Sequence, residues 1–239
     1  MKRGLAASRL RARELIEQGL VLVDGIPAAK AATQVSINQA ISLARQDYAW
    51  VGRGALKLLG VLAPFGVDPE GLTCADLGSS TGGFTEVLLK KGAARIYAID
   101  VGKGLLHYRL RDHERITLME GVNARHLEAL PEPIDLVVGD LSFISVGLIL
   151  PTVYRLLRPD GQAVILVKPQ FEVGRAALGR GGRVRSDSDR LEAIQVAQRT
   201  ATSLGFRVLG SIDSPIAGAK AGNVEHFLHL TKRVESEVD

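Results

Sequence analysis

Short apolar runs alternate with amphipathic stretches along the chain after Val51. Seven runs rich in β-branched and other apolar residues are predicted strands, at Thr73–Leu77, Arg95–Asp100, Ile116–Glu120, Ile134–Gly139, Ala163–Val167, Arg207–Ile212 and Val224–Leu230. Four predicted helices lie before or between them, at Ala55–Ala63, Phe84–Lys91, Val146–Leu157 and Asp189–Leu204. Strands that alternate with helices are joined by crossover connections, so the pattern predicts an α/β fold with a doubly wound, seven-stranded and mostly parallel sheet.

The last two predicted strands break this alternation. The loop between Ile212 and Val224 has no room for a long crossover helix, so the last strand should run antiparallel to its neighbours. The reversal would bring its first residues, including Glu225, to the edge where the parallel strands end. Ligands bind at that edge in doubly wound sheets.

The segment from Phe171 to Asp189 has a different composition. It is rich in glycine and arginine and holds few large apolar residues; these glycines and arginines are Gly174, Gly179, Gly181, Gly182, Arg175, Arg180, Arg183 and Arg185. Because so little of it can pack, we expect a mobile loop.

The N-terminal residues form a pattern of their own. Ser8–Gln18 is a predicted helix, with Leu15 inward and with Arg9 and Arg13 together on its outer face. Two short apolar pieces then flank Asp24-Gly25, a pair that favours a hairpin turn. A helix and a hairpin bury little apolar surface alone. We therefore expect a small α+β module over residues 1–47, a linker over 48–53, a larger domain over 54–232 and a tail over 233–239.

The basic charge is concentrated in that N-terminal part. Residues 1–45 hold seven lysines and arginines against three acidic residues, whereas the other 194 residues hold 23 of each. A local excess of positive charge suits contact with a phosphate backbone, although it also suits a solvated helix face.

The amino-acid composition limits the kinds of site that the chain can form. The chain has one cysteine, Cys74, which rules out an internal disulfide and a cysteine-based metal site. A reducing, cytoplasmic location is therefore expected, and we find neither a secretory signal nor an apolar run long enough to span a membrane. The five histidines show no ligand spacing, so no metal is assigned.

A glycine-rich turn follows the first strand of the larger domain. Residues 78–84 read Gly-Ser-Ser-Thr-Gly-Gly-Phe, and Asp100 closes the next predicted strand. Glycines at this place let the backbone approach a ligand, and an acid about 20 residues further on accepts hydrogen bonds from ribose hydroxyls. The motif indicates a nucleoside-containing cofactor. Its spacing is neither that of a dinucleotide site nor that of a phosphate-binding loop, so nicotinamide cofactors and nucleoside triphosphates are disfavoured.

Four charged residues should meet at the same edge of the sheet. Asp140 and Lys168 follow two predicted strands, Glu225 begins the reversed strand, and Lys57 lies on the helix before the first strand. Each alone is compatible with a surface ion pair. Together, two lysines and two carboxylates at a ligand-binding edge indicate a catalytic centre.

Several of these motifs resemble those of one known family. Asp76–Thr85, Asp100–Gly102, Gly139–Ile144, Val167–Glu172 and Gly222–Glu225 are similar to motifs of the hemolysin A (TlyA) family, a branch of the FtsJ-like, S-adenosylmethionine-dependent RNA 2′-O-methyltransferases. The N-terminal part resembles the S-four RNA-binding domain. The usual S-four domain opens with a helix that would precede Arg3, so this module is expected to lack it.

The resemblance implies roles for individual residues. The catalytic set would be Lys57, Asp140, Lys168 and Glu225. Contacts to S-adenosylmethionine would come from Asp76, Gly78, Ser80, Gly82, Gly83, Phe84, Asp100, Asn123 and Asp140. Contacts to RNA are expected from Arg9, Arg13, Lys30 and Arg53. The expected activity is methylation of a ribose 2′-hydroxyl of ribosomal RNA, by resemblance that of a cytidine, with ribosomal RNA or ribosomal subunits as partners and no membrane.

Lys168 is the predicted general base. A second cation and partial burial favour its neutral form, whereas Asp140 and Glu225 would hold and orient the ammonium. Two other classes remain open at this point: a non-catalytic RNA-binding or ribosome-associated protein that keeps cofactor binding, and a membrane-active hemolysin. No basic amphipathic helix with an aromatic face supports the latter.

Overall fold

The chain divides into two compact units, Met1–Ala49 and Trp50–Asp239, in the computed structural model. The structure describes residues 3–6, 9–17, 20–24, 26–28, 31–32, 34–36, 38–43, 50–219 and 221–233. Lys30, the first two residues of the predicted linker and nearly all of the predicted tail lie outside these ranges.

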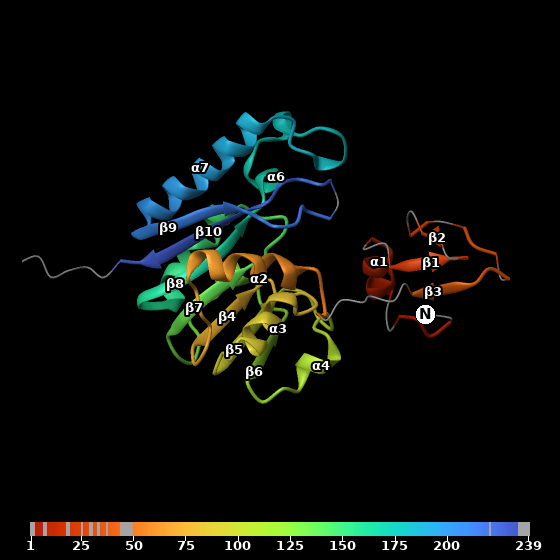
Figure 1. Ribbon diagram of the computed structural model, residues 1–239, viewed down its shortest axis with the longest axis horizontal. Helices are drawn as coiled ribbons and strands as arrows, with labels where there is room; N and C mark the ends of the chain where they lie inside the picture. The colour runs from red at the N-terminus through yellow and green to blue at the C-terminus, as the bar shows by residue number, and fades with distance from the viewer. Residues whose placement is uncertain are drawn as a thin grey trace, which may run out of the picture. The chain divides into compact units, whose positions relative to one another are not determined.

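The first unit contains one helix and a three-stranded antiparallel sheet (Figure 1). Helix α1 (Arg9–Glu17) buries Leu15 and exposes Arg9 and Arg13, as the sequence predicted. Strands β1 (Val21–Val23) and β2 (Ile26–Pro27) form the predicted hairpin, with Asp24 at a φ of 50° in the turn. Strand β3 (Ile41–Leu43) was not predicted; it pairs with the other side of β1.

The second unit is built on a seven-stranded sheet in the order β6-β5-β4-β7-β8-β10-β9 (Figure 1). Its strands are β4 (Thr73–Leu77), β5 (Arg95–Asp100), β6 (Ile116–Glu120), β7 (Ile134–Gly139), β8 (Leu157–Val167), β9 (Phe206–Asp213) and β10 (His226–Lys232). The strands from β6 to β8 are parallel to one another, and β10 runs antiparallel to both β8 and β9. The predicted fold class and the reversed last strand are thus confirmed.

Helices cover both faces of this sheet and divide the core in two. They are α2 (Gly54–Phe65), α3 (Gly83–Lys90), α4 (Tyr108–Arg111), α5 (Leu150–Leu156), α6 (Pro169–Glu172) and α7 (Asp187–Ser203), with 3₁₀ turns η1 (Ala124–His126), η2 (Val146–Leu148), η3 (Arg175–Ala177) and η4 (Arg180–Gly182). On one face α5 and α7 bury Val153 and Ile194. On the other, α2, α3 and α4 bury Leu58, Val87 and Leu110. Side chains alternate between the faces along a strand, so apolar runs such as β7 feed both cores.

The glycine- and arginine-rich segment is more ordered than its composition predicted. It contains α6, η3 and η4, and Leu178 and Val184 form an isolated antiparallel bridge. The side chain of Asn223 accepts a hydrogen bond from the Val184 N–H (2.9 Å) and donates one to the Gly182 carbonyl (3.0 Å). The expectation that nothing here could pack was wrong, because backbone hydrogen bonds rather than apolar side chains hold the segment.

Candidate active site

The carboxyl ends of the parallel strands and the start of β10 meet at one edge of the sheet, which is hollowed by two adjoining cavities. The first, of about 480 Å³, lies over the ends of β4, β5 and β7. The second, of about 390 Å³, lies beside β8 and β10. Ser142 and Phe143 line both cavities and therefore stand at the boundary between them.

The first cavity has the lining that a nucleoside requires. Its polar lining includes five of the predicted cofactor residues: Gly78, Ser80, Asp100, Asn123 and Asp140. Its apolar lining comes from Ile99, Val101, Leu105, Val122 and Ile144 among others. The Asp100 carboxylate accepts backbone hydrogen bonds from Ser80 (2.8 Å) and Gly102 (2.7 Å), which aim it while leaving lone pairs for ribose hydroxyls.

Gly78 forms part of the floor of this cavity. Its φ of 82° lies in the left-handed region, and a Cβ here would come within 3.1 Å of the Asp140 carbonyl oxygen. A larger residue would therefore be strained and crowded, which keeps the backbone accessible to a ligand.

The other four predicted cofactor residues do not line the cavity. Gly83 allows α3 to approach α2, since a Cβ would lie 2.9 Å from the Ala55 nitrogen. Gly82 precedes α3 with a φ of 97°, and Phe84 is buried against Phe227. In the structure these three residues shape the turn and its packing.

Asp76 is fully buried beneath the turn. The Thr85 hydroxyl donates a hydrogen bond to its Oδ2 (2.6 Å), and its Oδ1 has no partner. Burial raises the pKa of Asp76 to about 7, against the effect of the Thr85 hydrogen bond. A carboxyl that is buried and only partly satisfied costs stability, which is a common sign of a functional position.

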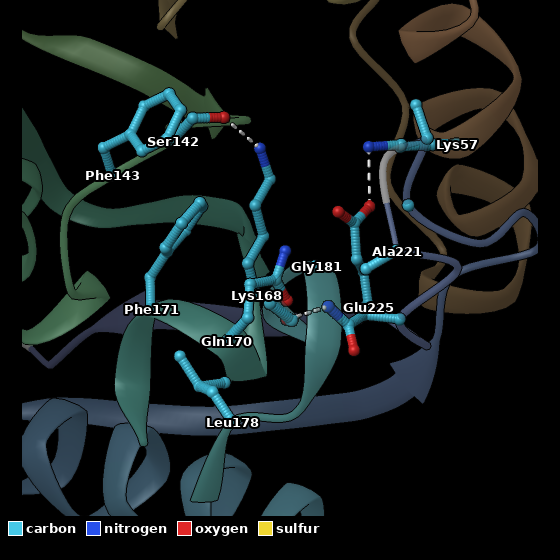
Figure 2. A pocket seen from close by; sticks show the side chains of 14 residues that line it. Lys57, Ser142, Phe143, Lys168, Gln170, Phe171, Leu178, Gly181, Ala221 and Glu225 are labelled. Carbon is cyan, nitrogen blue, oxygen red and sulfur yellow. Dashed lines mark hydrogen bonds and ion pairs between the residues drawn. The ribbon is translucent and has the colours of Figure 1, made fainter. Parts of the chain in front are cut away.

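The four charged residues form a continuous chain of contacts. Lys168 Nζ lies 2.6 Å from Asp140 Oδ1, and Lys57 Nζ lies 3.2 Å from Asp140 Oδ2 and 2.6 Å from Glu225 Oε2. Lys168 also donates a hydrogen bond to the Ser142 hydroxyl (2.7 Å; Figure 2). The structure therefore brings the predicted set together, with one difference in pairing: Glu225 contacts Lys57, not Lys168.

For Lys57 and Asp140, the attraction of neighbouring charges outweighs the effect of burial on the pKa. Burial favours the neutral form of Lys57, but Asp140 and Glu225 raise the pKa of its ammonium overall. Burial likewise favours the protonated form of Asp140, but Lys168 and Lys57 lower the pKa of its carboxyl overall. Asp140 is thus held as a carboxylate between two amines.

The second cavity combines these charges with aromatic side chains. Phe143 and Phe171 lie with ring centroids 5.2 Å apart, and Figure 2 shows them on the side of Lys168 away from Lys57 and Glu225. Phe143 is 80% exposed and has a φ of 64°, an unusual conformation that holds its ring over the cavity mouth. Sequence reasoning missed both phenylalanines and Ser142 as site residues, although all three lie inside the motifs that carried the family resemblance.

Family models match both units of the chain. A model described as FtsJ-like methyltransferase matches residues 50–232, and a model described as S4 domain matches residues 2–41. A Mycobacterium tuberculosis protein named 16S/23S rRNA (cytidine-2′-O)-methyltransferase TlyA is 46% identical over 98% of this chain and 88% of its own length. This chain belongs to the TlyA family of FtsJ-like methyltransferases.

Other members of the TlyA family carry different names. A Brachyspira hyodysenteriae protein named Hemolysin A is 36% identical over 95% of both chains. A solved structure of a Streptococcus thermophilus protein, also named as a hemolysin, superposes with a TM-score of 0.77 at 38% identity and covers 97% of this chain and 86% of that one. The shared fold thus extends over nearly the whole chain.

The cofactor of FtsJ-like methyltransferases is S-adenosylmethionine, and the first cavity fits it. The Asp100 carboxylate suits the ribose of the cofactor, and the apolar lining suits its adenine. At Gly78, which has no side chain, the rest of the cofactor can approach the protein backbone closely. The side chain of Asn123 accepts a hydrogen bond from the Arg125 N–H (3.0 Å), which fixes its orientation at the cavity wall.

The predicted RNA-contacting residues lie in different surroundings. Arg9 and Arg13 are exposed on α1 of the S4 unit. Arg53 precedes α2 and is half-buried, with its guanidinium 3.5 Å from the Ala217 carbonyl oxygen. Lys30 lies outside the described residues.

Proposed function

We propose that this chain transfers the methyl group of S-adenosylmethionine to a ribose 2′-hydroxyl of ribosomal RNA, at cytidine nucleotides. The observation that carries the proposal is the position of Lys168, whose amine lines the second cavity beside the two residues that separate it from the first. Relatives named as rRNA (cytidine-2′-O)-methyltransferases support the choice of acceptor.

The residues of this chain have to align the hydroxyl and remove its proton. S-adenosylmethionine supplies a methyl group already activated by its sulfonium, so no further activation of the donor is needed. Alignment of reactants contributes about 7–11 kcal/mol to lowering a barrier, and a positioned general base about 10²–10⁴-fold in rate. Positioning is therefore the larger effect.

Lys168 is the proposed base, and its contacts define how it acts. The 2′-hydroxyl proton would pass to Nζ of Lys168, and the resulting ammonium would be held by Asp140 and Ser142. Lys57 and Glu225 complete the chain of charges and fix Asp140 from its other oxygen. The rings of Phe143 and Phe171 line the second cavity and would stack on the base of the nucleotide.

Other methyl-transfer chemistries lack the residues they need. Methylation at carbon 5 of a pyrimidine uses a cysteine nucleophile, but Cys74 is fully buried in β4 and burial raises the pKa of its thiol. Methylation of a base amino group commonly uses Asp/Asn-Pro-Pro-aromatic after the fourth strand, where this chain has Asp140-Leu-Ser-Phe143. Ribose methylation requires neither.

The decisive experiment removes the proposed base. Lys168→Ala should abolish most single-turnover transfer of labelled methyl to rRNA while leaving S-adenosylmethionine affinity nearly intact. Lys168→Arg should fail as well, because a guanidinium stays protonated and accepts no proton. Transfer close to that of the wild type by Lys168→Ala would overturn the mechanism.

A double variant tests whether the charged residues act as a unit. If they do, adding Lys57→Ala to Lys168→Ala should cost little more, since effects within a catalytic unit are strongly non-additive. Equal losses of transfer and of cofactor affinity in Lys168→Ala would instead place Lys168 in the cofactor site.

The same assay separates this function from the two alternatives. Cofactor binding by the wild type without turnover on rRNA or on ribosomal subunits would favour a non-catalytic RNA-binding protein. Lysis of red cells by the purified protein would favour the activity that the hemolysin names suggest. In the described part of the chain, no helix is both long and apolar enough to cross a membrane.

A further inference from the structure

We propose that residues 174–186, which we call the arginine loop, bind the phosphates of the RNA strand on either side of the target nucleotide. The proposal rests on the proposed function and specifies how its substrate is held. The loop carries Arg175, Arg180, Arg183 and Arg185 within a short stretch next to the second cavity.

The four guanidinium groups of the arginine loop have no partner among the described residues of the protein. All four side chains are exposed, and in the described part of the chain none of them forms an ion pair or a side-chain hydrogen bond. Some arginines elsewhere in this unit are paired, as Arg111 is with Glu120 and Arg158 with Asp135. The loop therefore concentrates positive charge that the protein itself leaves unneutralised.

The nearest acidic side chains do not cancel this charge. Asp187 and Asp189 begin α7, directly after the loop. Asp187 faces Arg190, and Asp189 accepts a hydrogen bond from the Ser186 hydroxyl. Arg190 in turn pairs with Asp213 at 2.8 Å. Arg190 is thus the arginine that Asp187 and Asp213 contact, and with the four loop arginines it makes five arginines against three carboxylates, so the segment keeps a net positive charge.

The loop is anchored at the active site rather than free in solution. Asn223 is buried, bonds to the backbone on both sides of Arg183, and lies two positions before Glu225. Leu178, Gly181 and Gly182 of the loop line the second cavity itself (Figure 2). The loop that carries the arginines thus forms part of the wall of the cavity that the ribose of a target nucleotide would enter.

A separate polar hollow marks where a phosphate would fit. It has a volume of about 250 Å³, and its charged lining consists of three arginines, Arg183, Arg185 and Arg190, and one carboxylate, Asp187. Guanidinium groups bind phosphate oxygens through paired, charge-assisted hydrogen bonds. A ribose in an RNA strand carries phosphate groups on both sides, so an anion site next to a ribose site matches the chemistry of the backbone.

The experiment compares three sets of charges on otherwise equal proteins. The variant Arg180→Gln/Arg183→Gln/Arg185→Gln removes three loop charges, the corresponding triple lysine variant keeps them, and Arg207→Gln removes one exposed charge from β9 at the opposite edge of the sheet. Binding to rRNA is measured over a range of salt concentrations without turnover, and S-adenosylmethionine affinity is measured on the same preparations to show that each variant is folded.

Affinity for rRNA falls as salt rises, and the glutamine variant should make this dependence less steep. The slope of log affinity against log salt should shrink in magnitude by about two to three units, because each lost phosphate contact removes roughly 0.7–0.9 of a unit. The lysine variant should keep most of the slope, and Arg207→Gln all of it. Equal slopes for the glutamine variant and Arg207→Gln would overturn the proposal. If the wild-type protein binds rRNA with a salt dependence that the glutamine variant weakens, but transfers no methyl group, the proposed function is contradicted. The arginine loop would then still be an RNA-binding element.

Discussion

Asp100 holds the glycine turn, and we propose that it also binds the cofactor. Its two oxygens hold the backbone of Ser80 and Gly102, and the same carboxylate faces the first cavity. The hydrogen bonds position the glycine turn, so a substitution here acts on both the shape and the chemistry of the cavity.

We expect Asp100→Ala to weaken S-adenosylmethionine binding by at least the ~1.5–3 kcal/mol that a hydrogen bond to a charged group contributes. Asp100→Asn, which keeps one acceptor oxygen for the turn, should lose less. Titration calorimetry on folded variants measures both. Unchanged affinity in Asp100→Ala would remove this residue from the cofactor site.

The location of an individual residue was predictable from the sequence where it depends on the end of one strand or helix. Lys57, Asp140, Lys168 and Glu225 could be found from sequence, since each stands at a strand end or on the adjoining helix. The pairing of Glu225 with Lys57 could not, because it depends on side-chain geometry across two elements. The exposed ring of Phe143 could not be found either, since its position follows from an unusual backbone angle.

At the scale of elements, α6 is fastened to the loop that follows β7. Glu172 accepts hydrogen bonds from the Ser145 hydroxyl and the Val146 N–H, both at 2.7 Å. Burial raises the pKa of Glu172, against the effect of these two hydrogen bonds. The link joins the segment that carries Lys168 to the segment that carries Asp140.

We expect Glu172→Ala to reduce methyl transfer several-fold while leaving cofactor affinity unchanged. Alanine offers no acceptor to either the Ser145 hydroxyl or the Val146 N–H, so the link between the two segments is lost. Glu192→Ala, at an exposed position on α7, is the matched control. A transfer rate equal to that of the control would show that the link does not position the site.

Elements with an apolar run or a clear turn signal followed their sequence pattern, whereas some short elements without such a signal did not. Strands β4 to β7 coincide with the predicted runs, because several apolar residues in succession leave few alternatives. Strand β3 and helix α4 are only three and four residues long, too short for a periodic signal. Strand β8 begins at Leu157, earlier than the predicted Ala163. Its first residues are irregular, with Asp160 at a φ of 58°.

The whole molecule combines a basic S4 unit with a methyltransferase unit. The charge division along the chain and the family motifs both pointed to this combination. The arrangement of the arginine loop could not be predicted, because Asn223 holds it through backbone groups that any sequence offers.

If the S4 unit binds RNA through α1, Arg9→Gln and Arg13→Gln should each lower the salt slope of rRNA affinity by about one unit and leave cofactor affinity unchanged. Arg199→Gln, on the exposed face of α7, provides the comparison. Slopes that match the comparison in both variants would mean that the basic face of α1 is solvated and makes no RNA contact.

The ion pair between Lys57 and Glu225 joins the two ends of the methyltransferase unit. Contacts between residues so distant along a chain form late, because closing a long loop costs entropy before the contact stabilises anything. A nascent chain therefore displays its glycine turn and Asp100 well before translation reaches Glu225. The charged centre closes only once the last strand is made, so a partly synthesised chain has no complete machinery for transfer.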